Sequence, residues 1–598
     1  MSVRGRPAPV NTPRSGRGPS TRARLMLVVV LLVLASGGLV ARAVDLQVIH
    51  KKFYQKQGDE RFLRTVPIPV SRGTIFDRNG VPLAVSTPVE SLWANPPKLL
   101  EHSDRIPQLA KALDVDPDQL AQRLSRYADK QFVYLKRQMS PTAAKAVLAL
   151  KIPGVNEVRE YRRYYPSGAI TAHVIGFTNI DGHGIAGLEM AYNQWLSGKD
   201  GAKKVIVDGN GRVVENVEQV RAPKPGHNLT LSIDRRIQYL AWRELKDAMA
   251  KFHATSASMV VMNPRNGEVL AMVNFPSYNP NDLDSSTASE RRNRTVTDVF
   301  EPGSTAKAFT ITAALLSGKW TPTTKIQTSP GWWVVDGHTI KDDSNFGLID
   351  VTGVITHSSN VGASKIALSL PTKEMYGTFR AFGFGSPTGS EFPGESAGIL
   401  PIGRTWRTIR QATIGYGYGF SVTLLQLARA YSALADGGVI HRPSFVKGVD
   451  SPGNRVIPAD IDHEMINILE TVVEDPDGTA YGSARIAHYT VAGKTGTSHQ
   501  ADNGGYLQDT YNSVFAGMAP ASDPRLVGVV VVRGPQGAYF GTAVAAPVFQ
   551  KVMSGALRLL DIPPDKVDTA QVIGPDSARA VAASDPHGHG RLTGGAAG

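Results

Sequence analysis

The chain of 598 residues contains no cysteine, and this absence removes several kinds of chemistry at once. Without thiols the protein can form no disulfide bond, hold no thiolate zinc site and use no cysteine nucleophile. A large domain outside the cytoplasm can fold without disulfides, so the absence does not identify a compartment. Any covalent catalyst in this chain must therefore use another kind of nucleophile.

Acidic residues are missing from the first 24 positions, which contain six arginines. The formal net charge of the whole chain is +13, and subtracting these six leaves a mild +7 for the rest. Basic and aromatic residues are not interleaved as they are in many proteins that bind nucleic acid. The basicity therefore indicates membrane topology and gives no sign of a nucleic-acid partner.

Long hydrophobic runs are scarce, and one stands directly after the arginines. Residues 25–41 (LMLVVVLLVLASGGLVA) carry no charge and are close to the minimum length of a membrane-spanning helix. We predict a cytoplasmic tail over residues 1–24, an anchor over residues 25–43 and, by the positive-inside rule, a remainder outside the cytoplasm. The alternative is a cleaved signal peptide ending near the sequence ARA, although arginine is unfavourable within such a cleavage site.

The length of the chain allows two to four domains. The Pro/Gly-rich segment APKPGHNL (residues 222–229) separates two regions with different sequence patterns. Residues 44–225 mix strand-like and helical segments, which predicts an α/β domain. Within it, RGTIFDRNGVPLA (residues 72–84) indicates a β-hairpin that turns at Asn79-Gly80. No nucleophile in this region is arranged with a base, so we expect a non-catalytic pedestal.

Several charged residues and histidines of the pedestal invite a functional interpretation. Isolated residues of this kind seldom form sites. We therefore expect Asp77 and Arg78 to form a structural salt bridge, and His173 and His183 to be satisfied structural histidines.

Residues 226–567 predict an α+β domain in which one antiparallel sheet is covered by helices. A hairpin is expected to turn at Asn266-Gly267, three strands to lie between residues 488 and 534, and a helix to close the domain. Residues 568–598 are rich in Ala, Gly, Ser and Asp and predict a disordered tail. His587 and His589 could bind a metal opportunistically, but their place in this tail favours disorder.

The segment EPGSTAKAF (residues 301–309) places Ser304 and Lys307 three positions apart after a Pro-Gly pair. Residues i and i+3 of a helix share one face, so the amine can lie close to the hydroxyl. An amine kept dry can lose its proton and act as a base, and backbone N–H groups at a helix start suit an oxyanion. The spacing indicates a serine nucleophile, although S-x-x-K alone also occurs by chance.

Two further motifs follow in order: HSSNVG, with Ser358 and Asn360, and GKTGTS, which begins at Gly493. The ordered set S-x-x-K, S-x-N and K-T-G is the signature of penicillin-binding proteins and serine β-lactamases. Ser358 could relay a proton to a leaving amine, and Asn360 could offer its carboxamide to the backbone of a substrate.

The third motif lies on an expected strand. Lys494, Thr495 and Thr497 could hold a terminal carboxylate, and Gly496 leaves room for close approach. The N–H groups of Ser304 and Thr497 would then form an oxyanion hole.

With these motifs, and with RGTIFDRNGVPLA and TIGYGYGFSVTLLQLARAYSALADGG, the chain resembles class B penicillin-binding proteins, specifically division-specific peptidoglycan D,D-transpeptidases of the FtsI type. The resemblance extends from the anchor to about residue 565. It implies a dimerisation-type pedestal, then a transpeptidase domain anchored in the bacterial inner membrane at the septum. Ser304 would attack the D-Ala-D-Ala bond of a stem peptide, release D-alanine and pass the acyl group to an amine, without a cofactor or metal.

The resemblance also implies partners. β-Lactams would acylate Ser304, and division proteins such as the glycosyltransferase FtsW would bind the enzyme. Tyr539 and Phe540 would form a wall of the acyl pocket.

Three alternatives stay open. Elongation-specific relatives commonly carry aspartate in the second motif and K-S-G in the third, whereas this chain has Asn360 and Thr495. A serine β-lactamase or a β-lactam sensor would share the three motifs, but a hydrolytic class A enzyme would also need an E-x-x-L-N element, and none follows Asn360. A wall-binding scaffold with a decayed site is disfavoured because every candidate catalytic residue is present.

Overall fold

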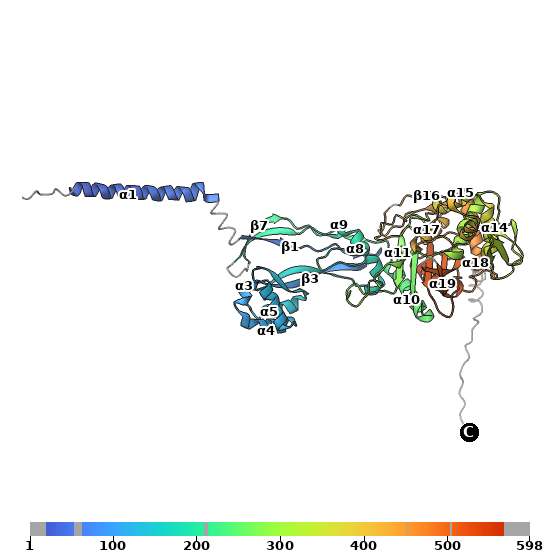
Figure 1. The fold of residues 1–598 in the computed structure, drawn as a ribbon, viewed down its shortest axis with the longest axis horizontal. Helices are drawn as coiled ribbons and strands as arrows, with labels where there is room; N and C mark the ends of the chain where they lie inside the picture. Colours follow the sequence, from blue (N-terminus) through green and yellow to red (C-terminus); the bar gives the residue numbers. More distant parts are fainter. Residues whose placement is uncertain (1–19, 53–62, 208–212, 450, 503–504, 567–598) are drawn as a thin grey trace, which may run out of the picture. The chain divides into compact units, whose positions relative to one another are not determined.

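A computed structural model describes residues 20–52, 63–207, 213–449, 451–502 and 505–566 of the chain (Figure 1). Most of the expected cytoplasmic tail and all of the expected C-terminal tail, with His587 and His589, lie outside these residues.

The N-terminal helix α1 (Thr21–Val44) continues as a single π-helical turn, Asp45–Ile49. Its apolar side chains are exposed, and by length and composition it could cross a membrane. It is the one helix of that kind among the described residues. The expected hydrophobic helix is therefore present and runs a few residues beyond the anchor predicted from the sequence.

The rest of the chain forms two compact units that interleave along the sequence. The first unit contains residues 91–158 with the flanking strands. Its three-stranded antiparallel sheet has the order β1-β6-β7, and its short helices enclose a separate core that includes Leu109, Leu113 and Leu124. The elements are β1 (Leu63–Ile68), α3 (Pro96–Leu100), α4 (Ile106–Leu113), α5 (Pro117–Arg126), β4 (Val133–Met139), α6 (Pro141–Leu148), β6 (Gly201–Val207) and β7 (Val213–Arg221).

The second unit includes the predicted hairpin, where β2 (Ile75–Phe76) pairs antiparallel with β3 (Pro82–Ala94). The turn is held by Asp77, whose carboxylate accepts from the backbone N–H groups of Asn79 and Val81 at 2.8 Å each. The expected salt bridge between Asp77 and Arg78 was wrong, because Arg78 pairs with Glu268 at 3.3 Å. The Asp77 carboxylate is used as a local backbone acceptor instead.

Of the two histidines singled out in this region, His173 has the structural surroundings expected from the sequence. His173 is buried and its Nε2 lies 2.8 Å from the carbonyl oxygen of Glu290. Burial lowers the pKa of His173 to about 4, so the ring is neutral near pH 7. His183 is exposed.

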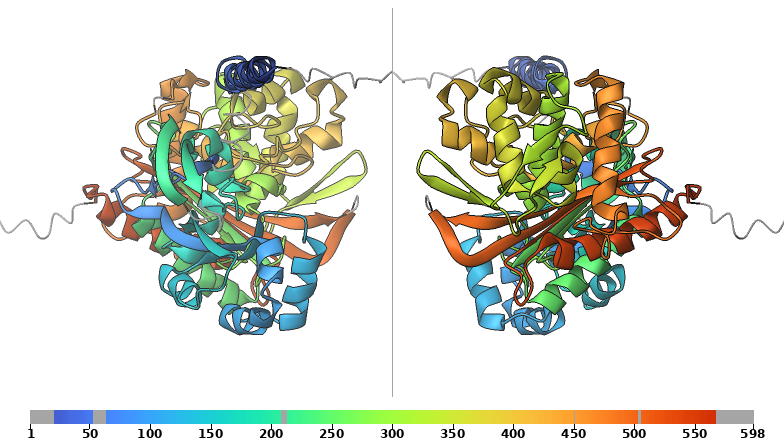
Figure 2. Two further views of the ribbon diagram at one scale, coloured as in Figure 1. Left: turned by 90° about the vertical axis from the view of Figure 1, so that its left-hand side faces the viewer. Right: turned by 90° about the vertical axis from the view of Figure 1, so that its right-hand side faces the viewer.

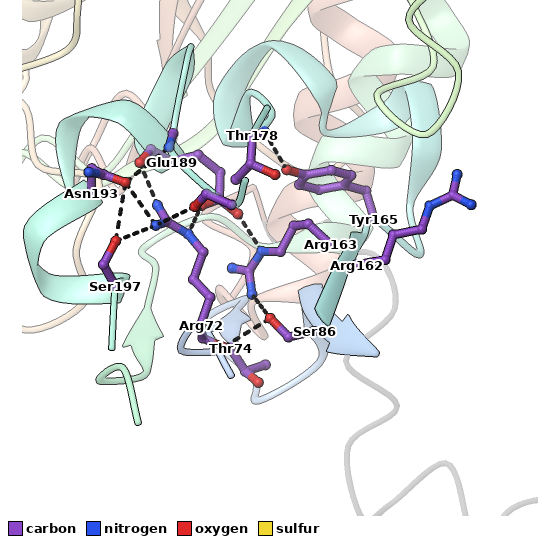
Figure 3. A network of polar contacts seen from close by, with 12 residues as sticks. Arg72, Thr74, Ser86, Arg162, Arg163, Tyr165, Thr178, Glu189, Asn193 and Ser197 are labelled. Atoms are coloured by element: carbon purple, nitrogen blue, oxygen red, sulfur yellow. Dashed lines mark hydrogen bonds and ion pairs between the residues drawn. The ribbon is translucent and has the colours of Figure 1, made fainter. Parts of the chain in front are cut away.

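A buried charge network links distant segments of the second unit (Figure 3). Glu189 has no exposed side-chain surface, and its two carboxylate oxygens accept from Arg72 Nε and Arg163 Nε at 2.6 Å each. Arg72 also donates to the side chains of Asn193 and Ser197 at 2.8 Å. The pairing offsets the cost of removing these charges from water.

As the sequence predicted, the core of the second unit is one antiparallel sheet; it has five strands in the order β10-β9-β19-β18-β17. Its central strands are buried on both faces. Helices α10 and α19 cover one face, and α17 and α18 cover the other (Figure 2). The strands are β9 (Ser256–Met262), β10 (Val269–Phe275), β17 (Ala492–Asp502), β18 (Gly505–Ala519) and β19 (Leu526–Arg533), and the covering helices are α10 (Arg235–Phe252), α17 (Leu424–Leu434), α18 (Ala459–Glu474) and α19 (Gly541–Leu559).

Strand β17 is the edge of this sheet. The helices next to the first two motifs are α12 (Lys307–Leu316), α13 (Val351–Thr356) and α14 (Asn360–Ser369). Helices α12 and α13 pack against α18, and α14 packs against α12 and α13.

The network around Glu189 yields a stability prediction. Arg72→Ala leaves a buried carboxylate with half of its charge compensation, so we expect the free energy of unfolding to fall by about 3–5 kcal/mol. Thermal and urea denaturation of the full-length protein in detergent would measure it. Lys325→Ala removes an exposed partner of Asp350 and should cost about 1 kcal/mol or less. An equal loss of unfolding free energy in Arg72→Ala and Lys325→Ala would contradict a stabilising role of the buried network around Glu189.

Candidate active site

Ser304 lies in a 3₁₀ turn, Gly303–Ala306, that leads directly into α12. The turn is closed by Thr305, whose hydroxyl donates to the carbonyl oxygen of Pro302 at 2.7 Å. Ser304 is half-buried, whereas the next residues are buried. The structure therefore confirms that the serine stands at a helix start.

Helix α12 is anchored by Phe309, which has no exposed surface. Its ring centroid lies 4.8 Å from that of Phe382, 4.9 Å from that of Phe384 and 5.5 Å from that of Tyr431. Such aromatic clusters contribute packing and favourable edge-to-face geometry. They fix the helix that positions Ser304 and Lys307.

The amine of Lys307 is fully buried and bonds to the second motif. Nζ donates to the Asn360 Oδ1 at 2.7 Å, to the Ser358 hydroxyl at 3.2 Å and to the Ser358 carbonyl oxygen. The spacing of the motif predicted an amine against the Ser304 hydroxyl, but no hydrogen bond joins these two side chains within the described chain. In the structure, the amine donates its hydrogen bonds to oxygen atoms of the S-x-N turn instead.

Burial lowers the pKa of Lys307 to about 7, because an ammonium group loses its hydration in the interior. Asp342 and Asp343 act in the opposite direction and raise it. A large share of the Lys307 amines is therefore neutral near pH 7, as a base requires.

The second motif forms the turn between α13 and α14. Ser358 has φ of +62°, a left-handed conformation that is unusual for a non-glycine residue and is found where surrounding structure enforces it. The enforcing group is Asp342: one carboxylate oxygen accepts from the Ser359 hydroxyl at 2.7 Å and the other from the N–H of Val361 at 2.9 Å. Sequence analysis missed Asp342, since an acidic pair within KDDS carries no distinctive spacing.

Asn360 is held from two sides. Its side-chain oxygen accepts from Lys307, and its Nδ2 donates to the carbonyl oxygen of Lys341 at 2.9 Å. The carboxamide is thereby fixed at the start of α14, next to the buried amine.

The third motif lies on the edge strand β17. Lys494 has no exposed surface, and burial followed by repulsion from Lys307 holds its pKa well below the usual range. Its Nζ lies 3.3 Å from the Thr495 hydroxyl, which in turn lies 3.2 Å from the hydroxyl of Thr479. The Thr497 hydroxyl accepts from the N–H of Gly541 at 3.2 Å. The structure therefore brings the third motif beside the first two.

Gly496 allows the turn that carries Ser304 to approach β17. A Cβ at this position would lie 2.9 Å from both the Pro302 carbonyl oxygen and the Thr305 methyl group. Sequence analysis assigned the space to a substrate, whereas in the structure this side of the glycine faces the turn.

A row of aromatic side chains continues from the cleft along β17 and β18. Tyr539, named from the sequence, is partly exposed and stacks on Tyr511 at 4.2 Å between ring centroids. Phe540 follows at 4.5 Å from Tyr539. His499 lies 4.5 Å from Tyr511. Tyr511 and His499 were missed because single aromatic residues on a strand usually indicate packing.

A half-buried serine, a dry amine near neutrality and a second buried lysine on a sheet edge thus meet in one place. This set of groups on a helix-covered antiparallel sheet is typical of the penicillin-binding class of enzymes.

Comparison with known proteins agrees with that class. The Penicillin binding protein transpeptidase domain matches residues 257–554, and the Penicillin-binding Protein dimerisation domain matches residues 67–231. The probable peptidoglycan D,D-transpeptidase PbpC of Pseudomonas aeruginosa is 45% identical over 92% of this chain and 97% of its own. Peptidoglycan D,D-transpeptidase FtsI of Escherichia coli K12 is 42% identical over 91% and 93%.

Among solved structures, penicillin-binding protein 3 of Mycobacterium tuberculosis in complex with aztreonam is similar, with a TM-score of 0.66 and 27% identity. The match covers 84% of this chain and 98% of that one. The chain therefore belongs to the class B penicillin-binding proteins, and it is a peptidoglycan D,D-transpeptidase with the two-domain fold of that family.

The approach of two backbone segments in the cleft yields a second prediction. Gly417 has φ of +96°, and a Cβ there would lie 1.8 Å from the carbonyl oxygen of Gly303, next to Ser304. Gly417→Ala should therefore displace the serine turn and reduce the rate of acylation by penicillin by about 100-fold or more. Gly419→Ala is the matched control: its φ is +81°, but the nearest atom would lie 3.5 Å away.

The control should show only the cost of a left-handed alanine, about 1 kcal/mol in unfolding. Rates would be measured by intact-protein mass spectrometry. Similar rates in both variants would show that the close approach does not position Ser304.

Proposed function

We propose that this enzyme forms peptide cross-links through a covalent acyl-enzyme on Ser304. The observation that carries the proposal is the fully buried Lys307, whose amine titrates near neutrality and is bonded to Ser358 and Asn360 in the cleft of Ser304. A neutral amine at this place can accept the serine proton, and the hydroxyl of Ser358 can pass it on.

In the first half-reaction the Ser304 oxygen bonds to the carbonyl carbon of the D-Ala-D-Ala peptide bond. The C–N bond breaks, and the proton from the serine reaches the leaving nitrogen through Lys307 and Ser358, so that D-alanine departs. In the second half-reaction an amine of a neighbouring strand attacks the ester. Its proton returns to the serine oxygen, and the cross-link is complete. N–H groups of Ser304 and Thr497 stabilise the oxyanion in both steps.

Substrate binding falls to the third motif. Lys494, Thr495 and Thr497 hold the terminal carboxylate of the stem peptide, while Gly496 keeps the strand close to the serine turn. The depressed pKa of Lys494 fits this role, since the incoming carboxylate restores the charge that burial and Lys307 oppose. Asn360 donates to the peptide backbone, and Tyr539 with Phe540 walls the acyl side.

We further infer that the cross-links are made in septal wall during division. In support, the FtsI relative is 42% identical over most of both chains, and the second and third motifs contain Asn360 and Thr495. The apolar helix α1 would anchor the enzyme in the inner membrane, with the N-terminus cytoplasmic and the catalytic domain outside. We keep the domain boundaries predicted from the sequence, with a pedestal over residues 44–225 and a transpeptidase domain over residues 226–567. In the septal role, a glycosyltransferase of the FtsW type would bind the enzyme.

The nucleophile can be tested directly. Benzylpenicillin should add its whole mass to the full-length protein, with the adduct mapping to the peptide that contains Ser304. Ser304→Ala should abolish this adduct and leave the thermal midpoint within a few degrees of wild type. An adduct that persists in the variant would refute the assignment, and rapid loss of the wild-type adduct would indicate a β-lactamase instead.

The base can be tested through pH. Lys307 must be neutral to accept a proton, so the second-order rate of acylation should be low below its pKa, rise tenfold per pH unit and level off above about 7. Lys307→Arg places a permanently protonated group there and should reduce the rate by about 1,000-fold or more. A profile that is flat between pH 5 and 9 in wild type would exclude Lys307 as the base.

A further inference from the structure

Three arginines stand close together on the surface of the second unit and have no part in the chemistry described above. Arg404 lies in the 3₁₀ turn Gly403–Thr405, Arg407 directly precedes helix α16 (Thr408–Gly415), and Arg410 lies in the first turn of that helix. All three residues are exposed. We call them the arginine row.

The arginine row lacks negative charge to balance it. In the described part of the chain these three side chains form no ion pair and no hydrogen bond, and the first turn of α16 contains no acidic residue. Other exposed arginines of this unit are paired, for example Arg442 with Glu391 at 3.1 Å. Like charges three positions apart on a helix repel each other, so the row is an unfavourable arrangement that an anionic partner would relieve.

The carboxylates on neighbouring elements do not neutralise the row. Asp336 accepts from the backbone N–H of Ile409 at 3.1 Å and so caps the start of α16. Glu374 is exposed on α15 (Thr372–Ala381), which packs against the 3₁₀ turn, and the adjacent Lys373 offsets its charge. The surface around the row therefore keeps an excess of positive charge.

Helix α16 is fixed against the helices of the first two motifs. The Gln411 side chain donates to two carbonyl oxygens at the end of α14 at 2.8 Å each, and the Gly415 carbonyl oxygen accepts from a threonine hydroxyl of α12 at 2.9 Å. Beyond the helix the carbonyl oxygen of Gly417 accepts from the N–H of Gly303 at 3.1 Å, beside Ser304. The arginine row is thus held on a rigid element that leads to the nucleophile.

The length of α16 indicates the separation between the row and the cleft. The eight residues of this helix rise about 12 Å. An extended peptide covers that distance in about four residues. A short peptide whose carboxylate is bound at the row can therefore present an amine near Ser304.

The reaction indicates which anion reaches this surface. Cross-linking needs a second strand that brings its amine to the acyl-enzyme, and each stem peptide that is not yet cross-linked ends in a carboxylate. An arginine side chain can bind a carboxylate through two parallel hydrogen bonds. The terminal carboxylate of the first strand is assigned to Lys494 on β17, so the row, on a different element, can serve the second strand.

We propose that the arginine row is a docking surface for the second, amine-bearing peptidoglycan strand and binds the carboxylates of its stem peptides. This docking surface rests on the proposed acyl transfer from Ser304. Its electrostatic attraction raises the local concentration of the second strand at the cleft.

The test blocks the cleft before binding is measured. Full-length protein in detergent is acylated to completion with benzylpenicillin, as followed by intact-protein mass spectrometry. It is then titrated with a fluorescent, soluble glycan fragment that carries uncross-linked stem peptides, and fluorescence anisotropy gives the Kd. The triple variant Arg404→Gln/Arg407→Gln/Arg410→Gln should raise this Kd about tenfold, the combined effect of three exposed charge contacts. Added salt should weaken binding by the wild type and have little effect on the variant.

The triple variant Arg235→Gln/Lys246→Gln/Lys251→Gln is the matched control. It removes three exposed cations from α10, with the same change of net charge, and should keep the wild-type Kd. An unchanged Kd in the arginine variant, or an equal rise of Kd in the control, would overturn the docking surface.

Two further probes define the partner. The same fragment with its carboxyl groups amidated should bind the wild-type protein about tenfold more weakly, and equal binding would contradict recognition of carboxylates. Arginine-dependent binding of a decaglutamate peptide, without such binding of the glycan fragment, would assign the surface to an acidic protein and overturn the proposal. Failure of benzylpenicillin to acylate Ser304 would instead refute the proposed function, which stays intact if only the docking surface fails.

Discussion

The catalytic cleft depends on keeping two lysine side chains, Lys307 and Lys494, entirely out of water. An isolated ammonium group is costly to bury, so the fold must either neutralise each amine or give it acceptors. It does both. The S-x-N turn supplies three oxygens to Lys307, and the carboxylates of Asp342 and Asp343 keep its pKa from falling further. The aromatic cluster around Phe309 fixes the helix that carries Lys307, and Lys494 is buried on the edge strand of the sheet.

Much of this architecture could be predicted from the sequence, because it follows from local patterns. The apolar helix, the hairpin at Asn79-Gly80 and the antiparallel sheet are encoded by continuous runs of residue types. The three motifs could be found because the residues of each are close together in the sequence. Each motif occupies a single helix start, turn or strand, which fixes the spacing of its residues. Their convergence could be expected from order alone, and the structure brings Lys307, Ser358 and Asn360 within hydrogen-bond distance.

The remainder depends on contacts between distant segments. Asp342 shapes the Ser358 turn from a neighbouring hairpin, and Arg78 pairs with Glu268 rather than with the adjacent Asp77. Gly417 is needed because another backbone segment passes within van der Waals contact of it. Glu301, Asn512 and Ser421 line one cavity, and each has a buried oxygen without a hydrogen-bond partner among the described residues. Only the structure brings these three residues together. No spacing rule connects such residues, since they lie on different elements and loops of the chain.

The outer strand of the sheet, β17, raises a different matter. Unprotected sheet edges invite pairing with other chains and hence aggregation, and proteins usually block them with charge, proline or a covering segment. Here the Pro302–Thr305 turn lies against a face of the strand at Gly496, which does not block its edge. The third motif lies on this same strand, so a proline or a covering segment at its edge would also obstruct a peptide that binds along it. The exposure that other proteins avoid is thus a requirement of the proposed binding mode.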